Sequence, residues 1–105
     1  MYDDIINSAA KQFNLDPKLI GAFISTESSW NPNATRYEPK LNDTSYGLMQ
    51  VLLATARRIS GNSSLTAEQL AQPSANILIG SQYIRELVNR YNGFLDDVIA
   101  RVDTE

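Results

Sequence analysis

The chain has 105 residues, of which 43% are hydrophobic and 20% are charged, and this length and composition predict one folded domain with a single core. Its formal net charge of -3 provides no basic face for neutralising phosphates, which argues against nucleic acid as a partner. Cysteine and histidine are both absent, which excludes disulfides, histidine-dependent triads and the usual zinc sites and leaves carboxylates as the natural acid/base groups.

The first predicted helix covers residues 3–13, because apolar residues recur there at helical spacing behind an acidic first turn. Its apolar face consists of Ile5, Ile6, Ala9, Ala10 and Phe13. Asp16 followed by Pro17 predicts the start of a second helix, since aspartate caps free amides and proline suits the first helical position. This second helix is expected to end near Ser29.

Glu27 is the unusual residue of the second predicted helix. The apolar stripe of Ile20, Phe23 and Ile24 continues at Glu27, so that a carboxylate occupies a position that the spacing assigns to the core. One interpretation is structural, a glutamate that reaches solvent at the helix edge or pairs with a buried arginine. The other is a desolvated carboxylic acid that donates a proton to a glycosidic oxygen. The spacing alone leaves both interpretations open.

The middle of the chain mixes turn formers with short helices. Residues 30–45 contain many turn formers and no periodicity, which predicts a long functional loop and no strand of useful length. A third helix is predicted over residues 53–60, with Gly61 as its end. Thr66 and Gln69 form a capping-box pattern that opens a short fourth helix, which ends before Pro73.

The longest predicted helix covers residues 73–91, and Asn92-Gly93 is expected to end it. Its apolar face consists of Ile77, Ile84, Leu87, Val88 and Tyr91. A last apolar stretch over residues 95–102 predicts the beginning of a further helix. The fold class expected from this series of elements is mainly α.

Three blocks of sequence carry a resemblance to a known family. They are Glu27-Ser28-Ser29-Trp30-Asn31-Pro32-Asn33-Ala34, Gly47-Leu48-Met49-Gln50-Val51, and a third block with Asn76-Ile77, Gly80, Tyr83-Ile84 and Leu87. In order and spacing they resemble the soluble lytic transglycosylase domain, which is also similar to goose-type lysozyme. The resemblance implies one lysozyme-like α-helical domain over residues 1–105, with a long loop between the catalytic helix and the Gly-Leu-Met-Gln segment.

The resemblance also implies the residues of the site. Glu27 matches the catalytic acid/base, and Gln50 with Met49 matches the segment that lines the cleft beside it. The further substrate-binding candidates are Ser45, Tyr83 and Asn76. A ligand contact is favoured for Gln50, because a buried amide needs partners that a sugar acetamido group can supply. For Met49 and Leu48, simple core packing is an equal alternative.

The implied reaction is cleavage of the β-1,4 bond between N-acetylmuramic acid and N-acetylglucosamine in peptidoglycan. Ordinary glycosidases use two carboxylates, but Glu38 and Asp43 are interpreted here as solvated loop charges. The family's solution with one carboxylate is substrate assistance, which yields a 1,6-anhydromuramoyl end and uses no water, metal or cofactor. A hydrolytic, lysozyme-like muramidase, in which Asp43 holds the attacking water, is the alternative.

The sequence departs from the family pattern in two places. An Ala-Tyr-Asn-Ala-Gly segment usually follows the last block, whereas residues 100–105 read Ala-Arg-Val-Asp-Thr-Glu, so that the domain looks short at its C-terminus and lacks a tyrosine. This departure implies weak activity, and it supports a second alternative, a catalytically weak glycan-binding or structural module of a phage or cell-wall protein. The loop between the first two blocks is also longer than usual, and Leu53-Ala54 replaces a common Pro-Gly.

The expected partners are peptidoglycan glycan strands, and the domain is expected to be a monomer. No apolar run approaches the roughly 20 residues that span a bilayer, and the acidic start, Met1 to Asp4, does not resemble a signal peptide. The domain is therefore expected to act in the periplasm or cell wall after export, holin release or virion delivery.

Overall fold

The computed structural model describes residues 2–104, and it describes their side chains up to residue 92. The elements in chain order are α1 (Asp3–Phe13), α2 (Pro17–Ser28), β1 (Thr35–Glu38), β2 (Asp43–Tyr46), β3 (Val51–Leu52), α3 (Leu53–Ser60), α4 (Ala67–Ala71) and α5 (Pro73–Thr104). Helices dominate this order, which confirms the predicted mainly α class.

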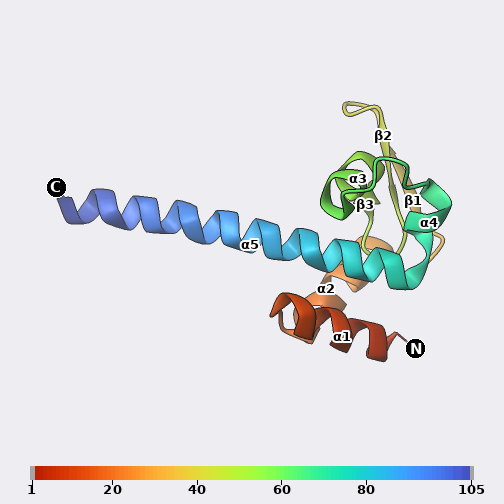
Figure 1. The fold of residues 1–105 in the computed structure, drawn as a ribbon, viewed down its shortest axis with the longest axis horizontal. Coiled ribbons are helices and arrows are strands. Elements are labelled where there is room, and N and C mark those ends of the chain that lie inside the picture. The colour runs from red at the N-terminus through yellow and green to blue at the C-terminus, as the bar shows by residue number, and fades with distance from the viewer. Residues whose placement is uncertain (1, 105) are drawn as a thin grey trace.

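Helix α5 is the element around which the others are arranged. Helix α1 packs along one side of it, whereas α3, α4 and the sheet lie on the other side (Figure 1). The second half of α5 extends away from the remaining elements (Figure 1). The first half of α5 is therefore the part that joins the two sides of the fold.

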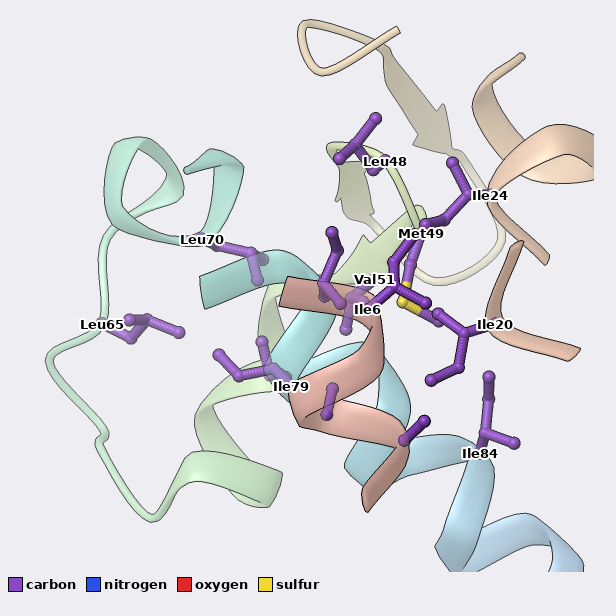
Figure 2. Close-up of a cluster of buried hydrophobic side chains, with 14 residues drawn as sticks. Ile6, Ile20, Ile24, Leu48, Met49, Val51, Leu65, Leu70, Ile79 and Ile84 are labelled. Carbon is purple, nitrogen blue, oxygen red and sulfur yellow. The ribbon is translucent and has the colours of Figure 1, made fainter. Parts of the chain in front are cut away.

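The core lies where α1, α2 and α5 meet the segment between β2 and β3. Its fully buried large side chains include Ile20 and Ile24 of α2, Leu48, and Ile77 of α5. Figure 2 shows the labelled side chains of this cluster, which come from these elements and also from β3 (Val51), the segment before α4 (Leu65) and α4 (Leu70). Each such aliphatic side chain stabilises the fold by about 1.5–3 kcal/mol when it leaves water. The apolar faces predicted for the helices thus supply half of the buried hydrophobic residues, whereas Leu87 and Tyr91 of the face predicted for the long helix are exposed.

The predicted helix starts and ends are confirmed for the first four helices. The Asp16 side chain accepts a hydrogen bond from the backbone N–H of Lys18 at 2.9 Å, and Pro17 opens α2. Gly61 ends α3 with a left-handed φ of 69°, which glycine adopts without steric cost. Thr66 and Gln69 form both hydrogen bonds of the capping box that opens α4.

The expectation of a strand-free loop over residues 30–45 is wrong. Strands β1 and β2 form an antiparallel hairpin in which Glu38 faces Asp43, and β2 also pairs with β3. The strands contain four, four and two residues, which is too short for an alternating pattern to identify them in the sequence. Main-chain pairing, rather than a buried face, defines this sheet.

The predicted end of the long helix at Asn92-Gly93 is also wrong, because α5 continues as one helix of 32 residues to Thr104. A glycine inside a helix costs only about 1 kcal/mol relative to alanine, which does not stop a helix that has good helix formers within a few residues on each side, here Arg90 and Leu95. The apolar stretch over 95–102 therefore belongs to α5 and does not begin a new helix. The side chains at these positions, and those of residues 100–105 where the family tyrosine is missing, lie outside the described part.

Candidate active site

Glu27 lies in the last turn of α2, directly before an unusual turn of the backbone. Ser29 and Trp30 both adopt left-handed conformations, with φ values of 51° and 66°. The Trp30 ring stacks on Tyr2, with ring centroids 6.5 Å apart. The chain thus leaves α2 in a turn that is tied to the start of α1, and this turn fixes where the helix end and Glu27 point.

The Glu27 side chain lines an open cleft of about 250 Å³. Helix α2 contributes Phe23 and Glu27, and α5 contributes residues that include Gly80, Tyr83 and Leu87. The hairpin and the following segment contribute the remaining wall, which includes Glu38, Leu41, Ser45, Met49 and Gln50. Five of the six predicted site residues, Glu27, Ser45, Met49, Gln50 and Tyr83, therefore meet around one cavity.

The expectation that Glu27 stands at a core position is wrong, because its side chain is exposed. Ile20 and Ile24 are fully buried and define the inner face of α2. Glu27 comes three residues after Ile24, in the final turn, where the helix passes over the open cleft instead of over packed side chains. The carboxylate is thus accessible to a molecule that enters the cleft.

Asn76, the sixth predicted site residue, does not line the cleft. Its side chain is completely buried, its Oδ1 accepts a hydrogen bond from the Met49 backbone N–H at 2.7 Å, and its Nδ2 donates to Tyr46 O at 2.7 Å and Leu70 O at 3.0 Å. Both amide hydrogens are therefore used on the main chain. Asn76 joins α5 to the segment after β2 and to α4, from behind the cleft.

Two close approaches around Asn76 and Met49 require glycine. Gly47 has a φ of 81°, and a Cβ on it would lie 2.5 Å from Asn76 Nδ2. A Cβ on Gly80 would lie 2.6 Å from the sulfur of Met49. Met49 is buried and also lines the cleft, so it packs in the core and its ligand contact stays a prediction, whereas Leu48 is a core residue with no exposed surface.

The Gln50 side chain stabilises the cleft wall around it through hydrogen bonds to the main chain. Its Nε2 donates hydrogen bonds to Ala34 O at 2.9 Å and Gly47 O at 2.8 Å, and its own backbone is left-handed with a φ of 50°. Both amide hydrogens donate to backbone oxygens of the chain itself. Only the amide oxygen is left for a ligand, and it can accept a hydrogen bond from a donor group of that ligand. Gln50 thus combines a structural role with a place in the cleft wall.

Asp43 differs from the solvated charge that the sequence suggested. Its Oδ1 accepts from the Thr44 N–H at 2.7 Å, and its Oδ2 accepts from the Ala54 N–H at 3.1 Å in the first turn of α3. Leu52, the N-cap residue of α3, makes no side-chain cap of its own. Asp43 therefore caps α3 from the neighbouring strand, and it is not part of the cleft lining.

Glu38 was interpreted from the sequence as a solvated charge, but it is a second carboxylate in the cleft lining. Its side chain is 35% exposed and forms an ion pair with Arg36, with 3.1 Å between Arg36 Nε and Glu38 Oε1. Only recognition of the β1–β2 hairpin would have placed this residue, since its neighbours in the sequence are turn formers. Among the described side chains, those of residues 2–92, no group of three acidic, histidine or cysteine residues could hold a metal ion.

A mainly α domain with a small sheet, and a helix-end glutamate that lines the cleft between them, defines the class of lysozyme-like domains. The family described as the transglycosylase SLT domain matches residues 4–102, and the chain belongs to this family. The transglycosylase of Enterobacteria phage PRD1 is 36% identical to it over 88 residues. That alignment covers 84% of this chain and 29% of the phage protein, so the chain spans under a third of this relative.

Proposed function

We propose that this domain cleaves the β-1,4 glycosidic bond between N-acetylmuramic acid and N-acetylglucosamine in peptidoglycan, with Glu27 as the catalytic acid/base. The observation that carries this proposal is the position of Glu27, an accessible carboxylate in a cleft whose wall includes both Gln50 and Tyr83. The family to which the chain belongs and the name of its phage relative support the same reaction.

The proposed mechanism uses one carboxyl group twice. Glu27 donates its proton to the glycosidic oxygen, so that the bond to the muramic acid C1 breaks and the glucosamine leaves as an alcohol. The acetamido group of the muramic acid stabilises the electron-poor C1. Glu27 then takes the proton of the sugar's own 6-hydroxyl, whose oxygen bonds to C1 and gives the 1,6-anhydro ring. A glycan that fills the cleft would exclude bulk water from the reacting atoms.

The partner in this proposal is the glycan strand of the cell wall, reached in the periplasm or cell wall by export, holin release or virion delivery. Among residues 2–104, no helix combines the length and the apolar character needed to cross a bilayer. We propose that the domain works as a monomer and that a single chain supplies the catalytic residue.

The first prediction is that Glu27→Gln abolishes cleavage and leaves the fold intact. The amide keeps the shape of the side chain but cannot transfer a proton, and removal of such a group costs a factor of about 10² or more. The measurement is mass spectrometry of fragments released from purified cell wall, together with the melting temperature. Glu68→Gln is the matched control, because Glu68 is an exposed glutamate of α4 outside the cleft lining.

Parent protein and the Glu68→Gln variant should release anhydromuramoyl fragments at equal rates. A Glu27→Gln variant that clears cell wall as fast as the parent would remove Glu27 from the mechanism. No products from the correctly folded parent would instead favour the catalytically weak glycan-binding module.

A hydrolytic muramidase is the second candidate, and the presence of Glu38 in the same cleft favours it. Two carboxylates in one cleft could serve as acid and as base for a water. Asp43 is not suited to that task, because its two oxygens already accept backbone hydrogen bonds. Reducing ends in place of anhydro ends among the products would select hydrolysis.

A further inference from the structure

We propose that Glu38 and Leu41, on the β1–β2 hairpin, bind the amino-sugar chain and set the affinity of the cleft for it. This proposal rests on the proposed function, since it concerns the substrate of the same site. The relevant part of the molecule is the rim formed by residues 36–43, which Figure 1 shows as the hairpin around β1 and β2 at one edge of the fold.

The hairpin holds its shape through its own contacts. Its turn is closed by the Leu41 N–H, which donates to Glu38 O at 3.1 Å, and the Tyr37 hydroxyl donates to Asn42 Oδ1 at 2.9 Å. Asp43, which faces Glu38 in the strand register, is anchored to α3 by the hydrogen bond from Ala54. The rim is thus fixed at its turn and at its base before any ligand is present.

The ion pair with Arg36 involves only one oxygen of the Glu38 carboxylate. The Arg36 side chain is 74% exposed and approaches Oε1 of Glu38, whereas no described residue donates a hydrogen bond to Oε2. An ion pair this exposed contributes little to stability, with about 0–1 kcal/mol as the usual range. The pair leaves acceptor capacity on the second oxygen of a carboxylate that lines the cleft.

Leu41 supplies the apolar half of this rim. Its side chain is 62% exposed and lines the same cleft as Glu38. A sugar ring offers hydroxyl and amide donors at its edge and C–H groups on its faces, so a carboxylate beside a leucine matches both kinds of surface. The described lining contains two glutamates and no lysine or arginine, which favours neutral donors over an anionic ligand.

Glu38 is assigned to binding and Glu27 to proton transfer because different elements carry them. Glu27 stands on a helix end that the Trp30 turn ties to the body of the fold. Glu38 stands on a two-stranded projection and is already paired with a cation. The two roles predict different kinetics, since loss of a binding contact that is equal in ground and transition states raises KM and leaves kcat unchanged.

The test measures kcat, KM and products for the Glu38→Ala, Glu38→Gln and Leu41→Ala variants on soluble glycan oligomers prepared from peptidoglycan, with Glu68→Gln as control. Glu38→Ala and Leu41→Ala should each raise KM about threefold to tenfold, the size of one lost hydrogen bond or apolar contact, with kcat within about twofold. Glu38→Gln keeps an acceptor oxygen and should restore most of the affinity. All variants should keep the product type of the parent.

Three outcomes would contradict this assignment. Unchanged KM in both Glu38→Ala and Leu41→Ala would remove the rim from binding. A collapse of kcat in Glu38→Gln, with loss of reducing-end products, would make Glu38 a catalytic base. A raised KM in Glu38→Ala that glutamine fails to restore at all would point to loss of the hairpin shape. In each case the parent still cleaves, whereas failure of the proposed function itself would appear as a parent without products.

Discussion

The cleft has a floor and a rim that are built in opposite ways. The floor is the segment from Tyr46 to Gln50, which the buried Asn76 holds through two hydrogen bonds to its main chain, while a third hydrogen bond joins Asn76 to Leu70 O of α4. The rim is the hairpin over residues 36–43, whose contacts are exposed, with Tyr37 56% and Leu41 62% accessible. Buried hydrogen bonds are costly to lose because the partners stay unsatisfied, whereas exposed ones are replaced by water. Changes in the floor should therefore reduce stability, and changes in the rim should mainly alter ligand binding.

The largest expected effect on stability comes from Asn76→Ala. This change leaves the Met49 N–H and two carbonyl groups without their partner in the interior, and each unsatisfied buried group costs about 1–3 kcal/mol. We expect a loss of about 3 kcal/mol or more in the free energy of unfolding, measured by denaturant titration. Asn7→Ala, at an exposed position of α1, is the matched control and should change stability little.

The Asn76→Asp variant refines the same test. Aspartate keeps an acceptor for the Met49 N–H but replaces the two donors by a carboxylate oxygen that faces the carbonyls of Tyr46 and Leu70. It should be at least as unstable as the alanine variant at neutral pH and should recover part of that loss in acid, where the carboxyl is protonated. Full activity and parent-like stability in both variants would show that the floor does not depend on this side chain.

A smaller effect is expected from Asp43→Ala, at the base of the rim. The change removes the cap that α3 receives from β2, and loss of a helix cap costs about 1 kcal/mol. Asp43→Asn keeps one acceptor oxygen and should lose less. Product type should be the same as for the parent in both variants, because Asp43 does not line the cleft. Complete loss of cleavage with intact stability would instead restore Asp43 as a second catalytic carboxylate.

The same contrast explains what could be predicted from the sequence. The Asp16 cap, the Gly61 end and the Thr66–Gln69 capping box depend on residues within a few positions of each other, so local patterns identified them. Asn76 contacts Met49 and Tyr46 from 27 and 30 residues away, and no local pattern contains such a pairing. Its place in the third sequence block suggested a ligand contact, but burial makes it a support.

Glu38 and Glu27 were misjudged for related reasons. Glu38 reaches the cleft only because two four-residue strands pair, and their pattern is too short to predict the hairpin. The stripe of α2 placed Glu27 in the core, since helical spacing does not show where the neighbouring elements stop covering a helix. The first sequence block was enough to select Glu27 as a site residue, whereas the exposure of its side chain depends on the tertiary arrangement.

The smallest expected effect concerns the exposed ion pair between Arg58 of α3 and Glu86 of α5. Like the contacts of the rim, this ion pair is accessible to water. A hydrogen bond from Arg58, at 2.8 Å, is the largest effect on the Glu86 carboxyl and lowers its pKa. Burial opposes this effect, and the charges of Arg58 and Arg90 add smaller effects that lower the pKa. Because the pKa of Glu86 is lowered in the folded state, the ion pair stabilises the fold at pH values above the ordinary pKa of 4.5. This contribution is lost as the pH falls through the pKa that Glu86 has in the folded state.

Glu86→Gln should therefore lower the melting temperature slightly at pH 7, and the difference from the parent should shrink as the solution is acidified below pH 4.5. Salt should reduce the difference as well, since the pair is exposed to screening. The Asn76→Ala difference, which arises from uncharged buried groups, should persist under both conditions. A Glu86→Gln difference that is unaffected by acid and by salt would mean that packing of the side chain, and not its charge, joins α3 to α5.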